Sequence, residues 1–199
     1  NTGEGCGELM IYGNPTSGLN TVSAGRHQYD IGFPVTTWWN TPYTYIYHCN
    51  NFLQNYNKAE LSTEVKEHYA AEVRVIRAYC YYLLTSLFGD VTLITTPAPP
   101  SDPIYKGPRT PKAQVVNFIY RELNDCFSKL PTEAQTLKNS GRINRWAALA
   151  LKARVALQNE NWSVAASAAD SVMRLSPHSL WGNYRTLFLV SSNTKFTDA

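Results

Sequence analysis

Apolar residues recur every three or four positions through most of the chain after residue 41, which is the spacing of amphipathic helices. The first such segment starts at Thr41-Pro42. Thr41 can cap a helix, and Pro42 suits the first helical position because an N–H there would be unpaired anyway. The positions that follow predict a helix over about residues 42–57: Tyr43, Ile46, Tyr47, Asn50 and Leu53.

The second helix has the clearest pattern in the chain. Ser62 is its expected N-cap, Glu64 lies near the positive end of the helix dipole, and Gly89 is placed to end it in a left-handed conformation. Burial of Leu83 or Leu87 is expected to stabilise the fold by about 1.5–3 kcal/mol each. One unbroken stripe predicts the buried face: Val65, Tyr69, Val73, Ile76, Cys80, Leu83 and Leu87.

A proline-rich connector over residues 95–111 separates this helix from the next. Its density of prolines excludes a regular helix or a central strand and predicts an extended segment with polyproline character. Helical spacing resumes after Thr110-Pro111, which repeats the Thr-Pro cap, and the third helix ends at Pro131. The positions that mark its buried face are Val115, Ile119, Leu123, Cys126 and Leu130.

Two further helices follow, with Asn144 and Asn161 as their expected caps, and a last short helix is expected over about residues 179–189. In the fourth and fifth helices, small residues and a terminal proline occupy the positions typical of a tetratricopeptide hairpin: Ala153, Ala165, Ala169 and Pro177. We therefore predict an all-α fold of tetratricopeptide-like helical hairpins, an α-α superhelix with long loops.

The domain organisation follows from these patterns. Residues 1–41 are rich in Gly, Thr, Ser and Asn and predict a loop-rich N-terminal segment. Residues 42–199 form the helical-repeat part, which includes the connector, so a single domain is expected overall. The chain has no initiating Met, signal peptide or lipid-attachment box, and it ends at Ala199 without a closing element. We expect a piece of a longer, larger fold.

Composition excludes only a few classes of function. A length of 199 residues with 44% hydrophobic residues supports a core, and a scattered net charge of +3 does not indicate nucleic-acid binding. No apolar run reaches the length of about 18 residues that a membrane-spanning helix needs. The charged trio Glu72, Arg74 and Arg77 predicts surface or interhelix pairing. The four cysteines form no C-x-x-C pair, and those within helical patterns are expected to be buried apolar groups: Cys49, Cys80 and Cys126, with Cys6 outside the helices.

Six segments, met in matching order and spacing from about residue 42 to residue 188, resemble the SusD/RagB family of outer-membrane nutrient-binding lipoproteins. One departure is Thr92, which stands where the family has proline in its Gly-Asp-Val-Pro-Leu turn. The segments are Asn50-Asn51-Phe52-Leu53, Glu72-Val73-Arg74-Val75-Ile76-Arg77-Ala78-Tyr79, Leu87-Phe88-Gly89-Asp90-Val91-Thr92-Leu93, Gly141-Arg142-Ile143-Asn144-Arg145-Trp146-Ala147-Ala148, Leu151 to Leu157 with Trp162 and Ala165, and Tyr184 with Leu187-Phe188.

The resemblance implies a non-enzymatic glycan-binding lipoprotein on the outer surface of the outer membrane of a Bacteroidetes-type bacterium. Such a protein acts as a lid on a SusC-like TonB-dependent transporter and captures oligosaccharides, or peptides in RagB-like members. It implies no cofactor and no nucleic-acid partner. The chain would be the N-terminal, helix-rich part of such a protein, and membrane contact would be made only through a lipid anchor that this chain lacks.

The candidate ligand-binding residues lie before the first predicted helix. A Trp face can stack on the apolar face of a sugar ring, so Trp38 and Trp39 are candidates, and Asn40 can add hydrogen bonds to hydroxyl groups. Packing of both Trp side chains onto the first helices is the alternative. The same loop holds further polar candidates, for which a plain surface position is the alternative: Arg26, Tyr29 and Asp30.

Other chemistries find little support in the sequence. Residues 13–20 have the glycine spacing of a phosphate-binding loop, but Leu19 and Asn20 stand where Lys and Ser/Thr are needed. The four His residues show no zinc-binding spacing, and no pair of carboxylates on one surface is evident for glycoside hydrolysis. We therefore predict no catalytic or metal-binding residue. A peptide-binding protein and a helical-repeat scaffold that binds other proteins remain the alternatives.

Overall fold

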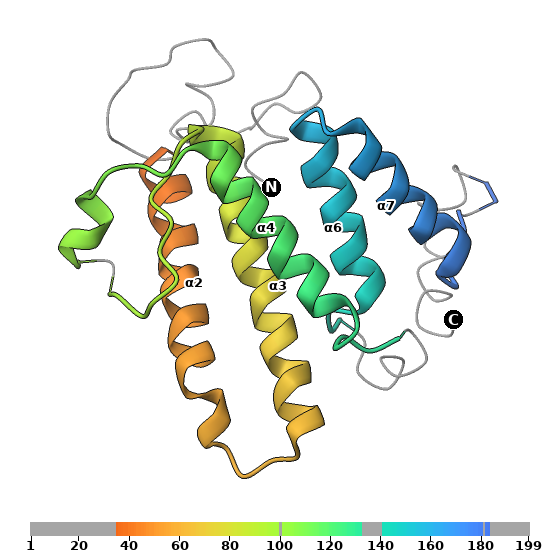
Figure 1. The fold of residues 1–199 in the computed structure, drawn as a ribbon, viewed down its shortest axis with the longest axis horizontal. Coiled ribbons are helices and arrows are strands. Elements are labelled where there is room, and N and C mark those ends of the chain that lie inside the picture. The colour runs from red at the N-terminus through yellow and green to blue at the C-terminus, as the bar shows by residue number, and fades with distance from the viewer. Residues whose placement is uncertain (1–34, 100, 133–140, 181, 184–199) are drawn as a thin grey trace, which may run out of the picture. The chain divides into compact units, whose positions relative to one another are not determined.

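The computed structural model describes residues 35–99, 101–132, 141–180 and 182–183. Over these residues the chain is helical and contains no named strand, so the predicted all-α fold is confirmed (Figure 1). None of the helices in this part of the chain combines the length and apolarity needed to cross a bilayer. The elements are α2 (Val35–Asn55), η2 (Tyr56–Lys58), α3 (Thr63–Phe88), η3 (Pro103–Lys106), α4 (Lys112–Phe127), α6 (Arg145–Gln158) and α7 (Trp162–Leu175).

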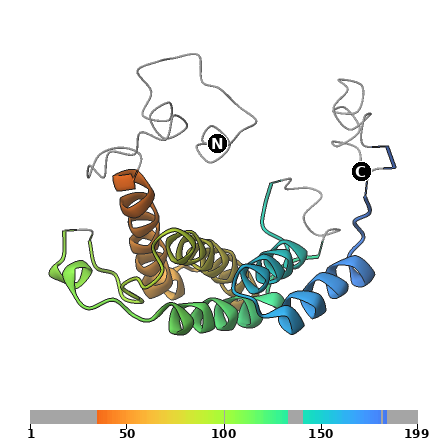
Figure 2. The ribbon, with the colours of Figure 1, turned by 90° about the horizontal axis from the view of Figure 1, so that it is seen from above.

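The chain divides into two compact units, residues 1–130 and residues 131–199, and each is described by itself. In the first unit, α2 and α3 form a hairpin joined through η2, and α3 packs against both α2 and α4 (Figure 2). In the second unit, α6 packs against α7 as a second hairpin. Helical hairpins of the predicted kind therefore form both units, while the prediction of a single domain stays a prediction.

The first helix begins earlier than its sequence suggests. We expected Thr41 as the cap and Pro42 as the first helical residue, but α2 begins at Val35 and holds Pro42 in its interior. The proline has no N–H to donate to the carbonyl oxygen of Trp38, a loss that costs about 3 kcal/mol in a helix. Packing offsets that cost, because Tyr43 and Ile46 beside it are only 3% and 0% exposed.

Both caps predicted for the second helix are present. The Ser62 side chain accepts a hydrogen bond from the Val65 N–H, and Gly89 follows the helix with φ of +70°. The predicted buried face is only partly correct, however: Cys80 is buried, but Ile76 is 41% exposed and Leu87 is 55% exposed. The reason is that α3 has two neighbours, so its buried surface is wide and includes small and polar residues: Ala70, Ala71, Glu72, Val75, Arg77, Ala78, Cys80, Tyr81, Leu84 and Thr85.

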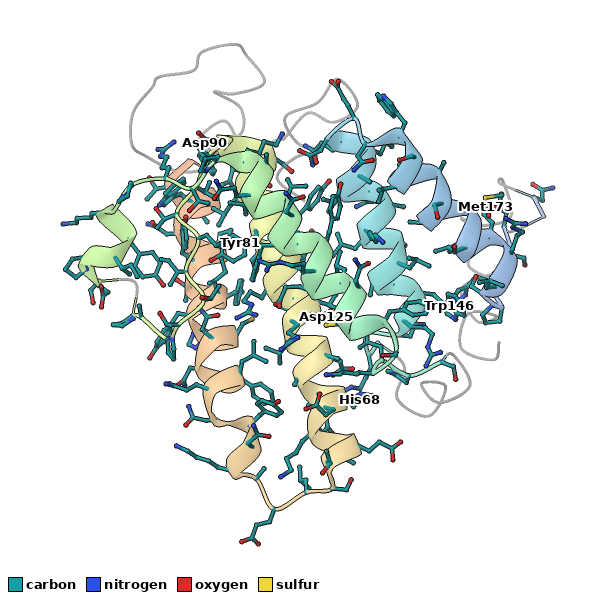
Figure 3. All side chains as sticks on the ribbon, in the orientation of Figure 1. His68, Tyr81, Asp90, Asp125, Trp146 and Met173 are labelled. Carbon is teal, nitrogen blue, oxygen red and sulfur yellow. The ribbon has the colours of Figure 1, made fainter. Side chains whose placement is uncertain are left out.

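The residues predicted for the buried face of helix α4 are each at most 2% exposed: Val115, Ile119, Leu123, Cys126 and Leu130. The helix ends at Phe127, earlier than the predicted end at Pro131, so Leu130 is buried just beyond it. Its start differs from the prediction, because neither Thr110 nor Pro111 caps it with a side chain. Instead a carboxylate oxygen of Asp90 accepts a hydrogen bond from the Lys112 N–H at 2.8 Å. Asp90 is labelled in Figure 3. Thr110 forms an isolated antiparallel bridge with Val91, which closes the connector at its base.

The second unit follows the predicted pattern at its helix starts. Asn144 accepts a hydrogen bond from the Ala147 N–H, and Asn161 accepts one from the Val164 N–H. Ala165 is buried at the α6–α7 contact as expected, but Ala169 is exposed and Ala168 is buried in its place. Most of the short helix expected over residues 179–189 lies outside the described residues.

Candidate ligand-binding site

Trp38, Trp39 and Asn40 lie in the first turns of α2, not in a loop before the helix as the sequence suggested. Trp38 and Trp39 are half-buried, and Asn40 is exposed. The backbone carbonyl of Asn40 accepts a hydrogen bond from the Thr44 hydroxyl, while its side chain extends from an exposed position. The other candidates, Arg26, Tyr29 and Asp30, lie outside the described residues.

Trp39 is the centre of an aromatic cluster, defined here as Trp39, Tyr43, Phe88 and Tyr105. The Trp39 ring meets Phe88 edge-on with centroids 5.0 Å apart and lies tilted to Tyr43 at 5.2 Å. Tyr43 in turn meets Tyr105 edge-on at 5.1 Å. These are favourable ring geometries. The cluster thus joins the start of α2, the end of α3 and the connector.

Arg109 covers part of Trp39. Its guanidinium carbon lies 5.2 Å from the centroid of the Trp39 ring, in a cation–π contact. Among the described residues no carboxylate forms an ion pair with Arg109, although one of its nitrogens approaches the Asp90 carbonyl oxygen at 3.5 Å. The side chain is exposed, so its remaining N–H donors are open to solvent.

The aromatic cluster and Arg109 were not found by sequence reasoning. Phe88 stands at the end of a helix and Arg109 at the end of the connector, far from Trp39 along the chain. No spacing rule links such residues. The sequence indicates that α3 ends at Gly89, but the Val91–Thr110 bridge that follows is known only from the structure.

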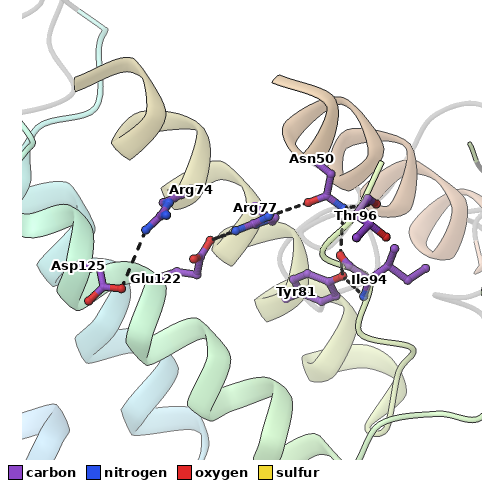
Figure 4. Close-up of polar contacts among 8 residues, drawn as sticks. All are labelled: Asn50, Arg74, Arg77, Tyr81, Ile94, Thr96, Glu122 and Asp125. Atoms are coloured by element: carbon purple, nitrogen blue, oxygen red, sulfur yellow. Dashed lines mark hydrogen bonds and ion pairs between the residues drawn. The ribbon is translucent and has the colours of Figure 1, made fainter. Parts of the chain in front are cut away.

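A buried network of three polar side chains joins helices α2, α3 and α4 (Figure 4). Arg77 of α3 donates from Nε and from a terminal nitrogen to one carboxylate oxygen of Glu122 on α4, at 3.0 Å and 2.5 Å. Its other terminal nitrogen donates to the Asn50 side-chain oxygen on α2 at 2.7 Å. All three residues are at most 6% exposed. The predicted interhelix pairing of Arg77 is therefore confirmed, and the Glu122 carboxylate is used to bind a guanidinium.

The buried tyrosines and cysteines are held in their neutral forms. Burial raises the pKa of Tyr43 to about 12, and burial also raises the pKa of Tyr81. Burial raises the pKa of Cys49 to about 11 and that of Cys126 to about 12. The prediction that the helical cysteines are buried apolar groups is confirmed, while Cys6 lies outside the described residues. Among the residues described, no three His, Cys, Asp or Glu side chains are grouped so as to hold a metal ion.

Comparison with known proteins matches most of this chain to a known family. A family described as "Starch-binding associating with outer membrane" matches residues 13–157. A SusD-like protein from Formosa agariphila is 30% identical over 155 residues, which are 77% of this chain and 29% of that protein. The chain therefore spans less than a third of that relative.

Solved structures agree with this match. A SusD-like carbohydrate-binding protein from Bacteroides fragilis superposes with a TM-score of 0.79 at 27% identity, over 92% of this chain and 35% of its own. A laminarin-binding SusD-like protein gives a TM-score of 0.74 at 25% identity, over 88% of this chain and 38% of its own. The match covers most of this chain in sequence and in structure, and the chain belongs to the SusD-like family.

Proposed function

We propose that this chain is part of a non-enzymatic surface glycan-binding protein that captures oligosaccharides for import through a SusC-like TonB-dependent transporter. Family membership supports glycans as the ligand class and the outer membrane as the location. The single observation that carries the proposal to this chain is the pair of half-buried Trp side chains beside an exposed Asn at the start of α2.

We assign different roles to these side chains. Trp39 is held by Phe88, Tyr43 and Arg109, so its role is to support the surface. Trp38 and Asn40 are the proposed contacts, the first through stacking on a sugar ring and the second through hydrogen bonds to hydroxyls. Arg109 adds exposed donors above the Trp39 ring. Arg26, Tyr29 and Asp30 keep the role proposed from the sequence.

Calorimetric titration with laminarin oligosaccharides, starch oligosaccharides and mixed peptides tests the ligand class. Laminarin is chosen because a similar structure is described as binding it. Trp38→Ala and Asn40→Ala are each expected to weaken glycan binding at least about tenfold, which corresponds to a loss of about 1.4 kcal/mol. Tyr45→Ala is the matched control, because Tyr45 is an exposed aromatic residue farther along α2. An equal loss for Tyr45→Ala would refute the proposed contacts.

Two other outcomes would redirect the proposal. Binding of peptides without any glycan would assign the chain to the peptide-binding, RagB-like branch. Binding of neither ligand would favour the protein-binding scaffold. The transporter step is tested separately, by asking whether a SusC-like transporter is recovered with the protein from detergent-solubilised outer membranes. Failure to recover it would remove the import role and leave the binding role standing.

A further inference from the structure

Residues 91–99, which lead from the end of α3 into the predicted connector and are counted with it from here on, are held by their backbone carbonyls in a regular way. The carbonyl oxygens of Thr92, Ile94, Thr96 and Ala98 each accept a hydrogen bond from a side chain. These are alternate residues, and in extended backbone alternate carbonyls point to the same side. Thr92, Ile94 and Ala98 are at most 7% exposed, so these carbonyls depend on side-chain donors instead of water.

The donors come mainly from the two helices beneath. Tyr43 of α2 donates to the Thr92 carbonyl. Tyr81 of α3 donates to the Ile94 carbonyl and accepts from the Ile94 N–H, and each of these two Tyr81 contacts is 2.8 Å long. Asn50 uses its amide nitrogen for two carbonyls, those of Ile94 and Thr96, each at 3.0 Å. Figure 4 shows the Asn50 and Tyr81 contacts converging on Ile94.

The orientation of the Asn50 amide is itself fixed. Its oxygen accepts from Arg77, and Arg77 is held by Glu122, so the amide nitrogen must face the connector. An Arg has only donors, which means that the reverse orientation of the amide would set N–H against N–H. The ion pair between α3 and α4 thereby determines which way Asn50 points.

The other end of the connector reaches the aromatic cluster. Tyr105 packs on Tyr43 and donates to the Ala98 carbonyl at 2.8 Å, and Arg109 lies over Trp39. A displacement of residues 92–98 would move the partners of both Tyr105 and Tyr43. The positions of the Trp39 ring and of Arg109 above it therefore depend on hydrogen bonds made two to three helical turns away along α2.

We propose that Asn50 is a positioning residue for the ligand-binding surface at the start of α2. It clamps the connector so that Arg109 stays over the Trp39 ring and Tyr105 stays packed on Tyr43, which contacts that ring. The ligand-binding part of this inference rests on the proposed function, since the surface at the start of α2 is the proposed glycan site. The clamp itself is a property of the chain without ligand. Loss of the two donors of Asn50 would release the connector while the helices stay folded.

Asn50→Asp tests the clamp at constant side-chain shape. The carboxylate still accepts from Arg77, but it presents oxygen to the carbonyls of Ile94 and Thr96. Asn51→Asp is the matched control, because it makes the same charge change at the next residue of α2, which is exposed. The readouts are the indole N–H resonance of Trp39, assigned through Trp39→Phe, and amide hydrogen exchange followed by NMR, both without ligand.

The clamp predicts a selective result. In Asn50→Asp the Trp39 resonance moves, while those of Trp146 and Trp162 in the second unit do not. Exchange of the Val91, Leu93 and Ile94 amides becomes at least about tenfold faster, while α4 amides stay within about twofold. Asn51→Asp changes neither. An unmoved Trp39 resonance, or connector exchange equal to that of the control, overturns the proposal.

A second variant keeps the test decisive if Asn50→Asp does not fold. Tyr81→Phe removes only the hydroxyl that bridges the Ile94 N–H and carbonyl, and the same criteria apply to it. Titration with laminarin oligosaccharides is then a separate readout. Weaker binding by a variant that is still folded by far-ultraviolet circular dichroism supports positioning of the surface. If the connector is released in the variants but the parent chain binds no glycan, the role of Asn50 as a clamp stands and only the proposed function is refuted.

Discussion

Removal of the Glu122 carboxylate is expected to cost the chain a large part of its stability. Glu122→Leu has nearly the volume of the original side chain, so the change removes a charge without opening a cavity. It leaves the Arg77 guanidinium, which is 6% exposed, with the Asn50 side-chain oxygen as its acceptor. Breaking a buried ion pair by removing one partner typically costs about 3–5 kcal/mol, because the remaining charge is uncompensated.

A matched surface pair sets the scale for this effect. Asp125 lies three positions along α4 from Glu122 and pairs with Arg74 of α3 at 3.9 Å, with 64% of the Asp125 side chain exposed. Exposed pairs contribute at most about 1 kcal/mol, so Asp125→Leu should change the free energy of unfolding by less than that. The two variants alter the same helix and the same type of partner and differ in burial.

Urea unfolding followed by far-ultraviolet circular dichroism measures both. With a slope of about 2 kcal/mol per molar urea, Glu122→Leu should lower the midpoint by about 2 M and Asp125→Leu by less than about 0.5 M. The double variant Arg77→Met/Glu122→Leu should recover most of the loss, because no buried charge remains. Equal midpoints for Glu122→Leu and Asp125→Leu would refute the reasoning.

Three further predictions concern local features. The Lys129 ammonium beside Glu67 lowers the pKa of that carboxyl, so the pair stabilises the fold at neutral pH, and this stability is lost as the pH falls through the lowered pKa. Lys129→Met should therefore make the urea midpoint depend less on pH in the acid range. An unchanged acid dependence of the midpoint would contradict this prediction. Burial raises the pKa of the Cys80 thiol to about 12, and Cys49 and Cys126 are buried as well. All three should therefore resist iodoacetamide at about pH 8 in the folded chain and react in urea, as peptide mass spectrometry would show. Fast labelling of the folded chain would argue against their burial. Asp90→Ala removes the acceptor for the Lys112 N–H and should cost about 0.5–2 kcal/mol in urea unfolding. Asp102→Ala, at the N-cap of the short helix η3, should cost less, and the reverse order would count against the Asp90 cap.

The features predicted correctly from the sequence are those that depend on neighbouring residues. Ser62, Asn144 and Asn161 cap their helices through an N–H three residues along, a contact within one helical turn. The buried face of α4 was also predicted correctly, because its large apolar residues lie in one stripe against α3. Local chemistry and a single packing contact can be recognised in the sequence.

The errors come from contacts between distant parts of the chain. Helix α3 packs between α2 and α4, and the sequence stripe of large apolar residues does not indicate that Ala70, Ala78 and Arg77 would fill that interface. The start of α2 was misplaced because Pro42 normally marks a helix start, and only the burial of its neighbours shows why it is tolerated. Arg109 reaches Trp39 only because the connector returns to the helices at Val91–Thr110.

The segments that carry the family resemblance turn out to hold the helices together. Arg77 bridges α3 to Glu122 and Asn50, Gly89 ends α3, and Asp90 caps α4. Such contacts require a particular residue at a particular place whatever the ligand is. It follows that the resemblance is strong evidence for the fold and weak evidence for the specificity. Trp38 and Asn40 lie outside those segments, so under the proposed function the choice of glycan is expected to depend on these two residues and not on the contacts that hold the helices together.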